Sequence, residues 1–424
     1  MHILFLSDNF PPETNAPATR GIEHAREWVK LGHRVTVVTC APNFPEGKVY
    51  AGYSNRWCQR ETLDGIEVVR VKTYIAPNKG FGLRVLDYLS FMVSGALAAL
   101  VQDRPDVVLA TSPQFFAAVA GWGVAALRGV PFVFELRDLW PESIKAVGAM
   151  RQSLAIRALE RLELFLYRRA SAVVAVTASF RDNLARRGID PGKVAVVRNG
   201  VDLSRYAPRP RDRALAEHYG VAGKFVVGYL GTHGMAHALQ RVLEAAELLR
   251  ERDDVHFLFV GAGAARDALL AEAQSKQLPN VSFHAGVPKD QMPGVWSLCD
   301  AGLVHLKRDE LFATVIPSKI FECFGMGVPV LYCGPEGEAA QLVRSADAGL
   351  TLPPEDPPAL ARAVVELADD RLRRARLASN AQRAAPLYDR ERNARAMLDV
   401  LLRCAGQPCA PAMPQTGSEQ RHAA

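Results

Sequence analysis

Short runs of apolar, β-branched residues alternate with longer amphipathic stretches along most of the chain. Strands buried on both faces carry such continuous runs, whereas the stretches between them have the 3.6-residue period of helices. Strands that alternate with helices are typical of a parallel sheet with crossover helices, so the pattern predicts an α/β fold. The predicted strands span residues 2–6, 34–39, 66–71, 107–110, 132–134, 172–176, 194–197, 225–230, 255–260, 281–284, 301–305 and 328–332.

The alternation is interrupted near residues 186–213, where prolines, glycines and charged residues come together. Because 424 residues exceed what one hydrophobic core usually serves, we expect two domains. A Rossmann-like, doubly wound domain is predicted over residues 1–195 and a second over residues 196–387. Ligands of such sheets bind beyond the carboxyl ends of the strands, so two facing sheets predict a cleft between the domains.

Two segments follow the second domain. A helical pattern over residues 388–403 is expected to return and pack on the first domain. Residues 405–424, rich in proline and small polar residues, predict a flexible tail.

The stretch 81–101 is the candidate membrane element. It contains Arg84 and Asp87, and its uninterrupted apolar part begins only at Phe91, which predicts a segment too short to span a bilayer. A buried crossover helix is the favoured interpretation, and a contact with a membrane surface is the alternative.

Charge is distributed unevenly along the chain. Residues 1–199 carry 25 Lys and Arg against 18 Asp and Glu, a net +7, whereas residues 200–424 carry 26 against 27, a net −1. The first half is therefore expected to meet an anionic partner: a polyanion, a phosphate-bearing substrate or an anionic membrane. Nucleic acid is disfavoured, because the arginines are not interleaved with stacking aromatic residues.

The seven cysteines include no C-x-x-C pair, so neither a disulfide framework nor a zinc site is predicted. The first ten residues, MHILFLSDNF, lack the basic start of a signal peptide and have the pattern of a buried strand. Together these features predict a cytoplasmic protein.

Two glycine turns follow predicted strands of the second half, one at Gly231 and Gly234 and one at Gly261 and Gly263. A helix is expected to begin directly after each turn. Glycines let the backbone approach an anion, and the free N–H groups of a helix start favour phosphate. Either turn is also compatible with an ordinary tight connection between strand and helix.

The segment 317–329 carries the most chemical information. Pro317 and Ser318 predict a helix start, with Lys319 and Glu322 one turn apart on it. A carboxylate there can accept both hydroxyls of a ribose, and the lysine can face a diphosphate. The alternative is a surface Lys–Glu pair of little energetic weight.

The order of these motifs resembles glycosyltransferase family 4, whose members have the two-domain GT-B fold. Glu322 followed by the Gly-Val-Pro-Val run at 327–330 resembles the family's donor segment, and the Asn-Gly-Val-Asp run at 199–202 resembles its interdomain element. The resemblance extends to about residue 388. It implies these residues for binding of a nucleotide-sugar donor: Glu322, Lys319, Thr314, Gly231, Thr232, His237, Gly261, Gly263 and Asn199.

Within the family, the chain is most similar to transferases of bacterial surface polysaccharides, including those of N-acetylfucosamine-type sugars. The similar residues are those at 10–16 and 137–142, predicted to open onto the cleft. The resemblance implies that the loops at 10–16 and 137–142 face the acceptor. The alternative is that their residues only cap or pack these loops locally. The residues implied on the catalytic side are Asp138, Arg137 and Glu13, with Asn15 and Trp140 beside the acceptor.

The chain departs from the family pattern at four positions. Thr314 stands where the first of two glutamates is common, and Thr232 and His237 stand where a diphosphate-binding Arg and Lys are common. Another cation must then face the diphosphate: Lys319, Lys307 or Arg308. Arg137 replaces a histidine expected to touch the 6-hydroxyl of the sugar, which favours a 6-deoxy donor.

The resemblance implies transfer with retention of configuration, from a UDP-linked sugar, without a metal or a resident cofactor. It implies a polyprenyl-diphosphate-linked acceptor at the cytoplasmic face of the inner membrane, with headgroup contacts from Arg157, Arg161, Arg168 and Arg169. Two other classes stay open. A UDP-GlcNAc 2-epimerase has the same fold and donor class, and the presence of Thr314 is compatible with a non-catalytic subunit of polysaccharide assembly.

Overall fold

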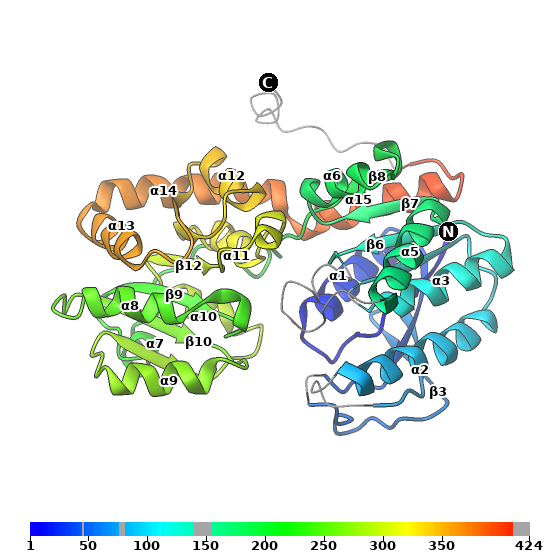
Figure 1. Cartoon of the computed structure of the whole chain (residues 1–424), viewed down its shortest axis with the longest axis horizontal. Helices are drawn as coiled ribbons and strands as arrows, with labels where there is room; N and C mark the ends of the chain where they lie inside the picture. Colours follow the sequence, from blue (N-terminus) through cyan, green and yellow to red (C-terminus); the bar gives the residue numbers. More distant parts are fainter. Residues whose placement is uncertain (45, 76–80, 113, 140–153, 410–424) are drawn as a thin grey trace.

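The computed structural model describes residues 1–44, 46–75, 81–112, 114–139 and 154–409. They form two domains, each built on a mainly parallel sheet with helices on both faces (Figure 1). The α/β prediction of two Rossmann-like domains is therefore confirmed.

The sheet of the first domain has the strand order β3-β4-β2-β1-β5-β6-β7-β8. All neighbours pair in parallel except β3, which is antiparallel to β4. The strands are β1 (His2–Leu6), β2 (Arg34–Cys40), β3 (Cys58–Leu63), β4 (Ile66–Val71), β5 (Val107–Thr111), β6 (Phe132–Leu136), β7 (Ala172–Ala175) and β8 (Val194–Val196).

Helices cover both faces of this sheet. One apolar core joins the sheet to α1 (Ala16–Lys30) and α15 (Arg390–Cys404). A second core, on the opposite face, joins it to α2 (Phe81–Leu100), α3 (Phe115–Arg128), α5 (Leu154–Arg169) and α6 (Ala178–Arg186).

The sheet of the second domain is parallel throughout, in the order β11-β10-β9-β12-β13-β14. Its strands are β9 (Phe225–Leu230), β10 (Val255–Val260), β11 (Val281–His284), β12 (Ala301–His305), β13 (Val330–Cys333) and β14 (Gly349–Leu352). Apolar cores lie on both faces of this sheet. One core contains residues of α7 (Arg213–His218), α10 (Met292–Trp296), α11 (Lys319–Met326) and α12 (Glu338–Ser345). The other contains residues of α8 (Gln240–Leu248), α9 (Arg266–Ser275) and α13 (Pro357–Asp369), and α14 (Arg371–Ala384) contributes to both cores.

Every predicted strand is present, with ends that differ by at most two residues. Two strands were not predicted. In β3, polar residues predominate and exposed positions alternate with half-buried ones, because only one neighbour and one face cover this edge strand. In β14, the four residues are all half-buried at the opposite edge of the second sheet. Both therefore lack the continuous apolar run of a central strand.

The chain passes between the domains twice, and the two passages run side by side. The N–H of Val201 donates to the Tyr388 carbonyl at 2.9 Å, and the N–H of Arg390 donates to the Val201 carbonyl at 3.1 Å. Beyond this point α15 packs on α1, where the Trp28 indole N–H donates to the Ala394 carbonyl at 2.8 Å. The last helix thus lies on the first domain (Figure 1).

The expectation of a buried helix at 81–101 is wrong for the outer side of α2. Only 17% of the window Leu83–Leu100 is buried, and by length and composition this window is long and apolar enough to cross a membrane. Phe91 and Ala99 pack into the core of the first domain, whereas Leu97 on the outer side is 62% exposed. The helix connects β4 to β5, and among the described residues it has packing partners on one side only.

Candidate functional site

Three loops meet at the carboxyl edge of the second sheet. Gly231 follows β9, Gly261 follows β10, and α11 comes after β12. Strand β9 lies between β10 and β12, so these loops are neighbours in space although up to 90 residues separate them in sequence.

Lys319 lies against the β9 loop. A Cβ atom added to Gly231 would lie 3.0 Å from the Lys319 Cε and 3.5 Å from its Nζ. The Nζ atom is 4.0 Å from the centre of the Tyr229 ring. Burial lowers the pKa of Lys319 to about 8. Of the other two cations considered from the sequence, Arg308 is exposed and donates to the Pro354 carbonyl, whereas the backbone N–H of Lys307 donates to the Ala236 carbonyl of the β9 loop at 3.0 Å. Lys319 is the cation whose side chain lies against Gly231.

Glu322 lies one turn further along α11. Its Oε2 accepts a hydrogen bond from the Trp296 indole N–H at 3.0 Å, which joins α11 to α10. Burial raises the pKa of this carboxyl group, while Arg390, Lys319 and Lys289 oppose the rise by attracting the charged form. Glu322 and Lys319 therefore lie close together at the carboxyl edge of the sheet.

Thr232 and His237 lie in the same loop but bring no positive charge. The His237 Nδ1–H faces the His305 carbonyl at 3.2 Å, and the His305 Nδ1–H faces the His237 carbonyl at 2.7 Å. Burial lowers the pKa of His237 to about 4, so its ring is neutral at pH 7. The Thr232 carbonyl accepts from the Tyr229 hydroxyl at 2.7 Å.

The expectation that a helix begins directly after Gly234 is wrong. A 3₁₀ turn spans Met235–His237, Ala238 then has a φ of 42°, and α8 begins only at Gln240. The mutual His237–His305 bonds hold this turn against β12, which delays the helix.

Gly261 and Gly263 face neighbouring backbone. A Cβ on Gly261 would lie 1.9 Å from the Gly231 carbonyl oxygen, and one on Gly263 would lie 2.4 Å from the His233 carbonyl oxygen. These glycines therefore let the β10 loop pack directly under the β9 loop. Their expected contact with a donor stays a prediction.

In the first domain, Glu13 and Asn15 both accept hydrogen bonds from backbone N–H groups. The Glu13 Oε1 accepts from the N–H groups of Asn43 and Phe44, both at 2.8 Å, and burial raises the pKa of this carboxyl group. The Asn15 Oδ1 accepts from the Ala18 N–H at 3.0 Å and caps α1. Only the Asn15 bond is local capping, since Glu13 joins its loop to a segment 30 residues further along the chain. Acceptor contacts of these residues stay predictions.

Arg137 and Asp138 follow β6. Their N–H groups donate to the Ser112 hydroxyl at 2.7 and 3.3 Å, which ties the β6 and β5 loops together. Burial lowers the pKa of Arg137 to about 10, and its Nε has no hydrogen-bond partner among the described residues. Trp140 lies outside the described residues.

Asn199 is held by the first domain. Its Oδ1 accepts from Arg20 on α1 at 3.4 Å, and the same guanidinium donates to the Glu135 carboxylate at 2.8 Å. Although burial opposes ionisation, Arg20 and Arg137 hold the pKa of Glu135 at about 2. These contacts place Asn199 beside the loops of the first domain and not beside the β9 loop.

Further ion pairs connect the domains. Lys289, which follows β11, donates to Glu23 of α1 at 3.3 Å, and Arg390 of α15 pairs with the same carboxylate. Burial lowers the pKa of Lys289 to about 8. In the part of this junction that the described loops around Glu23, Glu135 and Glu322 form, these three carboxylates are surrounded by Arg20, Arg137, Lys289, Lys319 and Arg390. This excess of positive charge suits a ligand with several negative charges.

Sequence reasoning missed Arg20, Lys289 and Arg390, since no local pattern marks them. It also missed Asp8, directly after the central strand β1. Burial, with Asp87 and Glu13 nearby, raises the pKa of Asp8 to about 8. Its position at the carboxyl end of the first strand was the available signal.

Thr314 lies at another contact between the domains. Its hydroxyl donates to the Leu311 carbonyl at 2.7 Å, and its own carbonyl accepts from the Thr177 hydroxyl at 3.0 Å. Nearby, Glu338 of α12 accepts from Arg198 at 2.7 Å and from the Ser179 N–H at 3.1 Å. The described contacts therefore give Thr314 a place in domain packing.

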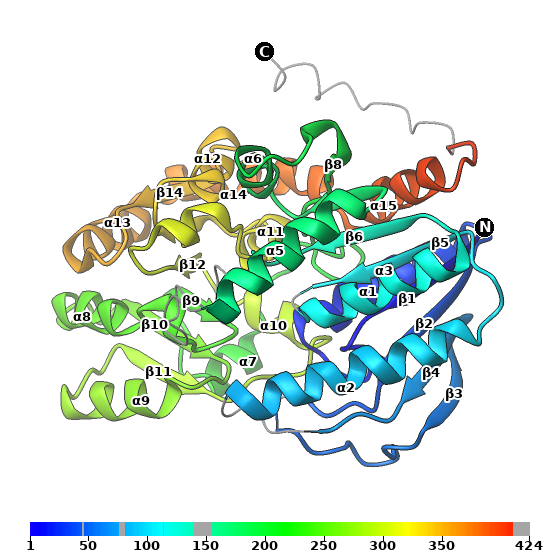
Figure 2. The same cartoon turned by 45° about the vertical axis from the view of Figure 1, so that its right-hand side comes forward.

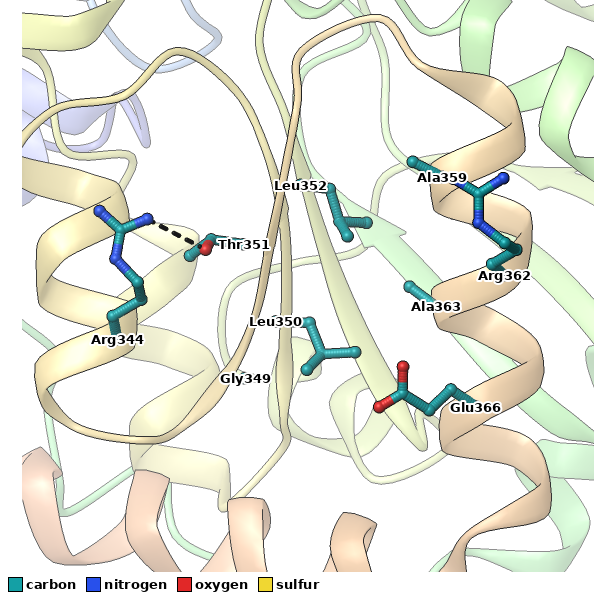
Figure 3. A pocket seen from close by; sticks show the side chains of 9 residues that line it. All are labelled: Arg344, Gly349, Leu350, Thr351, Leu352, Ala359, Arg362, Ala363 and Glu366. Carbon is teal, nitrogen blue, oxygen red and sulfur yellow. Dashed lines mark hydrogen bonds between the residues drawn. The ribbon is translucent and has the colours of Figure 1, made fainter.

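A separate pocket of about 410 Å³ lies along the edge strand β14, between α12 and α13 (Figure 3). Arg344 of α12 is one of the lining residues and donates to the Thr351 hydroxyl at 3.2 Å. None of the site residues above lines it.

Within the described ranges, no group of three or more His, Cys, Asp or Glu side chains is arranged to hold a metal ion.

Comparison with known proteins gives consistent results. Residues 18–200 match the glycosyl transferase 4-like domain, and residues 224–370 match the glycosyl transferases group 1 domain. The glycosyltransferase WbjE of Pseudomonas aeruginosa is 26% identical over 66% of this chain and 70% of its own length. WcaI of Escherichia coli K12, named for colanic acid biosynthesis, is 25% identical over 77% and 82%.

The fold is shared with solved structures. HepE of Anabaena, in complex with UDP and glucose, superposes with a TM-score of 0.72 at 21% identity, over 95% of this chain and 99% of HepE. At this identity the likeness establishes a common architecture.

Proposed function

Because the chain is a glycosyltransferase built from a glycosyl transferase 4-like domain and a group 1 domain, we propose that it transfers a sugar from a nucleotide diphosphate to a glycan acceptor in polysaccharide synthesis. The observation that carries the proposal is the position of Lys319 beside Gly231, with Glu322 one turn along the same helix. A cation, a glycine loop and a buried carboxylate at the carboxyl edge of a parallel sheet suit a nucleotide diphosphate.

In this proposal the Lys319 ammonium pairs with the diphosphate, and the Glu322 carboxylate accepts hydrogen bonds from the ribose hydroxyls. The base is uracil and the sugar is a 6-deoxy N-acetylamino hexose. Support for uracil is the UDP held by HepE, which shares the fold. Support for the 6-deoxy sugar is Arg137 at the position of a histidine in the family.

The proposed reaction retains the anomeric configuration and uses no metal or resident cofactor. The bond between the sugar C1 and the diphosphate oxygen breaks, and a bond from C1 to the acceptor oxygen forms on the same face. The acceptor proton passes to the departing diphosphate. Lys319 and the neighbouring Lys289 and Arg390 stabilise the negative charge that develops there.

The acceptor is proposed to bind on the first domain, near Asp8, Glu13 and Asp138. We take it to be a polyprenyl-diphosphate-linked glycan at the cytoplasmic face of the inner membrane. The net charge of +7 over residues 1–199 supports an anionic, membrane-held acceptor.

A thermal-shift panel with UDP, GDP and dTDP tests the donor site, because a ligand at 100 times its Kd stabilises the folded state by about 2.7 kcal/mol. We expect UDP to raise Tm most, and Glu322→Ala to abolish the shift. No shift with any nucleotide would contradict the proposal. Conversion of a UDP-sugar to its isomer without acceptor would instead identify an epimerase.

A further inference from the structure

The outer side of α2 is an exposed apolar stripe. It consists of four residues of α2 and the residue directly after the helix, here called the α2 stripe: Leu83, Leu86, Val93, Leu97 and Val101. Between 48% and 75% of each residue is exposed. A set of large aliphatic side chains so exposed on one element is unusual in a monomeric protein and marks an interaction surface.

The spacing keeps the α2 stripe on one side of the helix. Steps of three, seven, four and four residues all fit the 3.6-residue period, and the stripe is about 27 Å long at 1.5 Å per residue. On the opposite side, Phe91 and Ala99 are buried in the core of the first domain. The helix is therefore held flat against the domain and cannot leave it to span a bilayer without exposing this core.

Two more exposed aliphatic residues lie at helix ends on the same face of the domain. Leu127 at the end of α3 is 75% exposed, and Leu154 at the start of α5 is 83% exposed. Helices α2, α3 and α5 cover the same face of the first sheet, as Figure 2 shows.

Basic residues border this surface. Arg84 on α2 and Arg157 and Arg161 on α5 are exposed. Four acidic groups lie on these helices or directly after them. Glu163 is buried and pairs with Arg187, and Asp103, just past α2, pairs with Arg34 at 2.6 Å. Asp87 of α2 and Glu160 of α5 each take part in an interaction as well. An apolar stripe with a basic border has the composition of surfaces that lie in the headgroup region of an anionic bilayer.

We propose that the α2 stripe docks the first domain on an anionic lipid bilayer, with its aliphatic side chains inserted below the headgroups and the arginines paired with lipid phosphates. A second copy of the chain is a poorer partner, since two such surfaces would bring their arginines together. The inference rests on the proposed function in one respect: a lipid-linked acceptor gives the docking its use.

Topology connects this surface to the candidate site. The first turn of α2 follows β4 and the first turn of α5 follows β6, so both helices begin at the carboxyl edge of the first sheet. Arg137 and Asp8 lie at that same edge. A bilayer against α2 would therefore hold a lipid-linked glycan close to the junction of the domains.

Flotation with vesicles tests the docking. The full chain is mixed with vesicles of phosphatidylcholine containing 30% phosphatidylglycerol, or with phosphatidylcholine alone, without donor or acceptor. We expect binding to the anionic vesicles, and about a tenfold or greater loss for the double variant Val93→Asp with Leu97→Asp. Leu372→Asp is the matched control, because Leu372 is 85% exposed on α14 of the other domain; it should bind as the unmodified chain does.

A second variant separates charge from insertion. Arg157→Gln with Arg161→Gln should weaken binding about five- to thirtyfold, and binding of the unmodified chain should fall with salt. Unchanged binding by the Val93/Leu97 variant with an unchanged Tm would overturn the proposal. A dimer that this variant dissociates, without vesicle binding by the unmodified chain, would overturn it in favour of a self-interface. Neither result bears on UDP binding, which the thermal-shift panel measures separately.

Discussion

Lys319 lies beside a loop whose own side chains bring no positive charge. Where the family resemblance implies an Arg and a Lys, this loop has Thr232 and a neutral His237. Lys319 reaches the same loop from α11 and packs over the Tyr229 ring. Burial disfavours the charged form of this ammonium group and lowers its pKa to about 8.

This pKa makes donor affinity dependent on pH. The pKa of Lys319 is lowered from 10.5, so the charged form is complete well below pH 8 and is lost as the pH rises through 8. We expect the Kd for UDP to increase above pH 8, by up to about tenfold per pH unit, relative to its value at pH 7, where both Lys319 and the terminal phosphate are mainly charged. Titration calorimetry from pH 6 to 9.5 measures this.

The control variant is Lys319→Arg, because a guanidinium stays charged throughout this range. Its Kd should vary much less above pH 8. An equally steep curve in Lys319→Arg would assign the effect to another group, of which Lys289 is the first to test because its pKa is also about 8.

Substitution of Glu322 should affect donor binding and thermal stability differently. Because burial raises the pKa of Glu322, its ionised form costs folding free energy at neutral pH, and that cost disappears once the group is neutral. Glu322→Gln should therefore leave Tm unchanged or higher while raising the KM for the donor about tenfold or more. Thermal unfolding and steady-state release of UDP measure the two effects. A lower Tm with an unchanged KM would assign Glu322 to the fold alone.

At the scale of elements, the site depends on how two loops stack. The β9 loop lies directly on the β10 loop, and the contact leaves no room for a Cβ at Gly261. The 3₁₀ turn that follows is held by His237 and His305, so the loop geometry does not depend on a helix start.

Gly261→Ala should lower both stability and donor affinity. The new Cβ would lie 1.9 Å from the Gly231 carbonyl oxygen and must push the β9 loop away from Lys319. We expect a loss of about 1–3 kcal/mol in the free energy of unfolding and weaker UDP binding. Chemical denaturation and calorimetry measure these. Gly286→Ala is the control, because its Cβ would lie 3.7 Å from the nearest atom, the Gly261 Cα, and should change little.

At the scale of the molecule, polar contacts hold the domains in the arrangement described. Glu338 joins α12 to Arg198 and Ser179 of the first half, and Lys289 joins the β11 loop to Glu23. The two passages of the chain between the domains are themselves paired at Val201 and Asp389.

Glu338→Ala should loosen this arrangement. It removes the acceptor for Arg198 and Ser179 without touching either core, so we expect a larger radius of gyration by small-angle scattering and a KM raised about three- to tenfold. Glu336→Ala is the control, because Glu336 is exposed and pairs with Arg344 inside the second domain. If both variants behave as the unmodified chain, the Glu338 contact does not govern domain closure.

Much of the fold could be predicted because its signals are local. Central parallel strands carry apolar runs, and each of those runs forms a strand in the structure. Glu322 and Lys319 could be placed on one helix since three residues of separation put them one turn apart. The edge strands β3 and β14 escaped because partial exposure permits polar residues.

The sequence by itself determined the class of fold, the order of the strands and helices, and the placement of Lys319 and Glu322 one turn apart on one helix, since these follow from composition and period within a few residues. Only the tertiary structure decided which distant groups meet. It brought Lys319 to Gly231, directed Glu13 to the backbone of residues 43 and 44, gathered Arg20, Lys289 and Arg390, and left one side of α2 uncovered. Such contacts join segments that are tens to hundreds of residues apart, and they depend on how the sheets and helices pack, which no local pattern encodes.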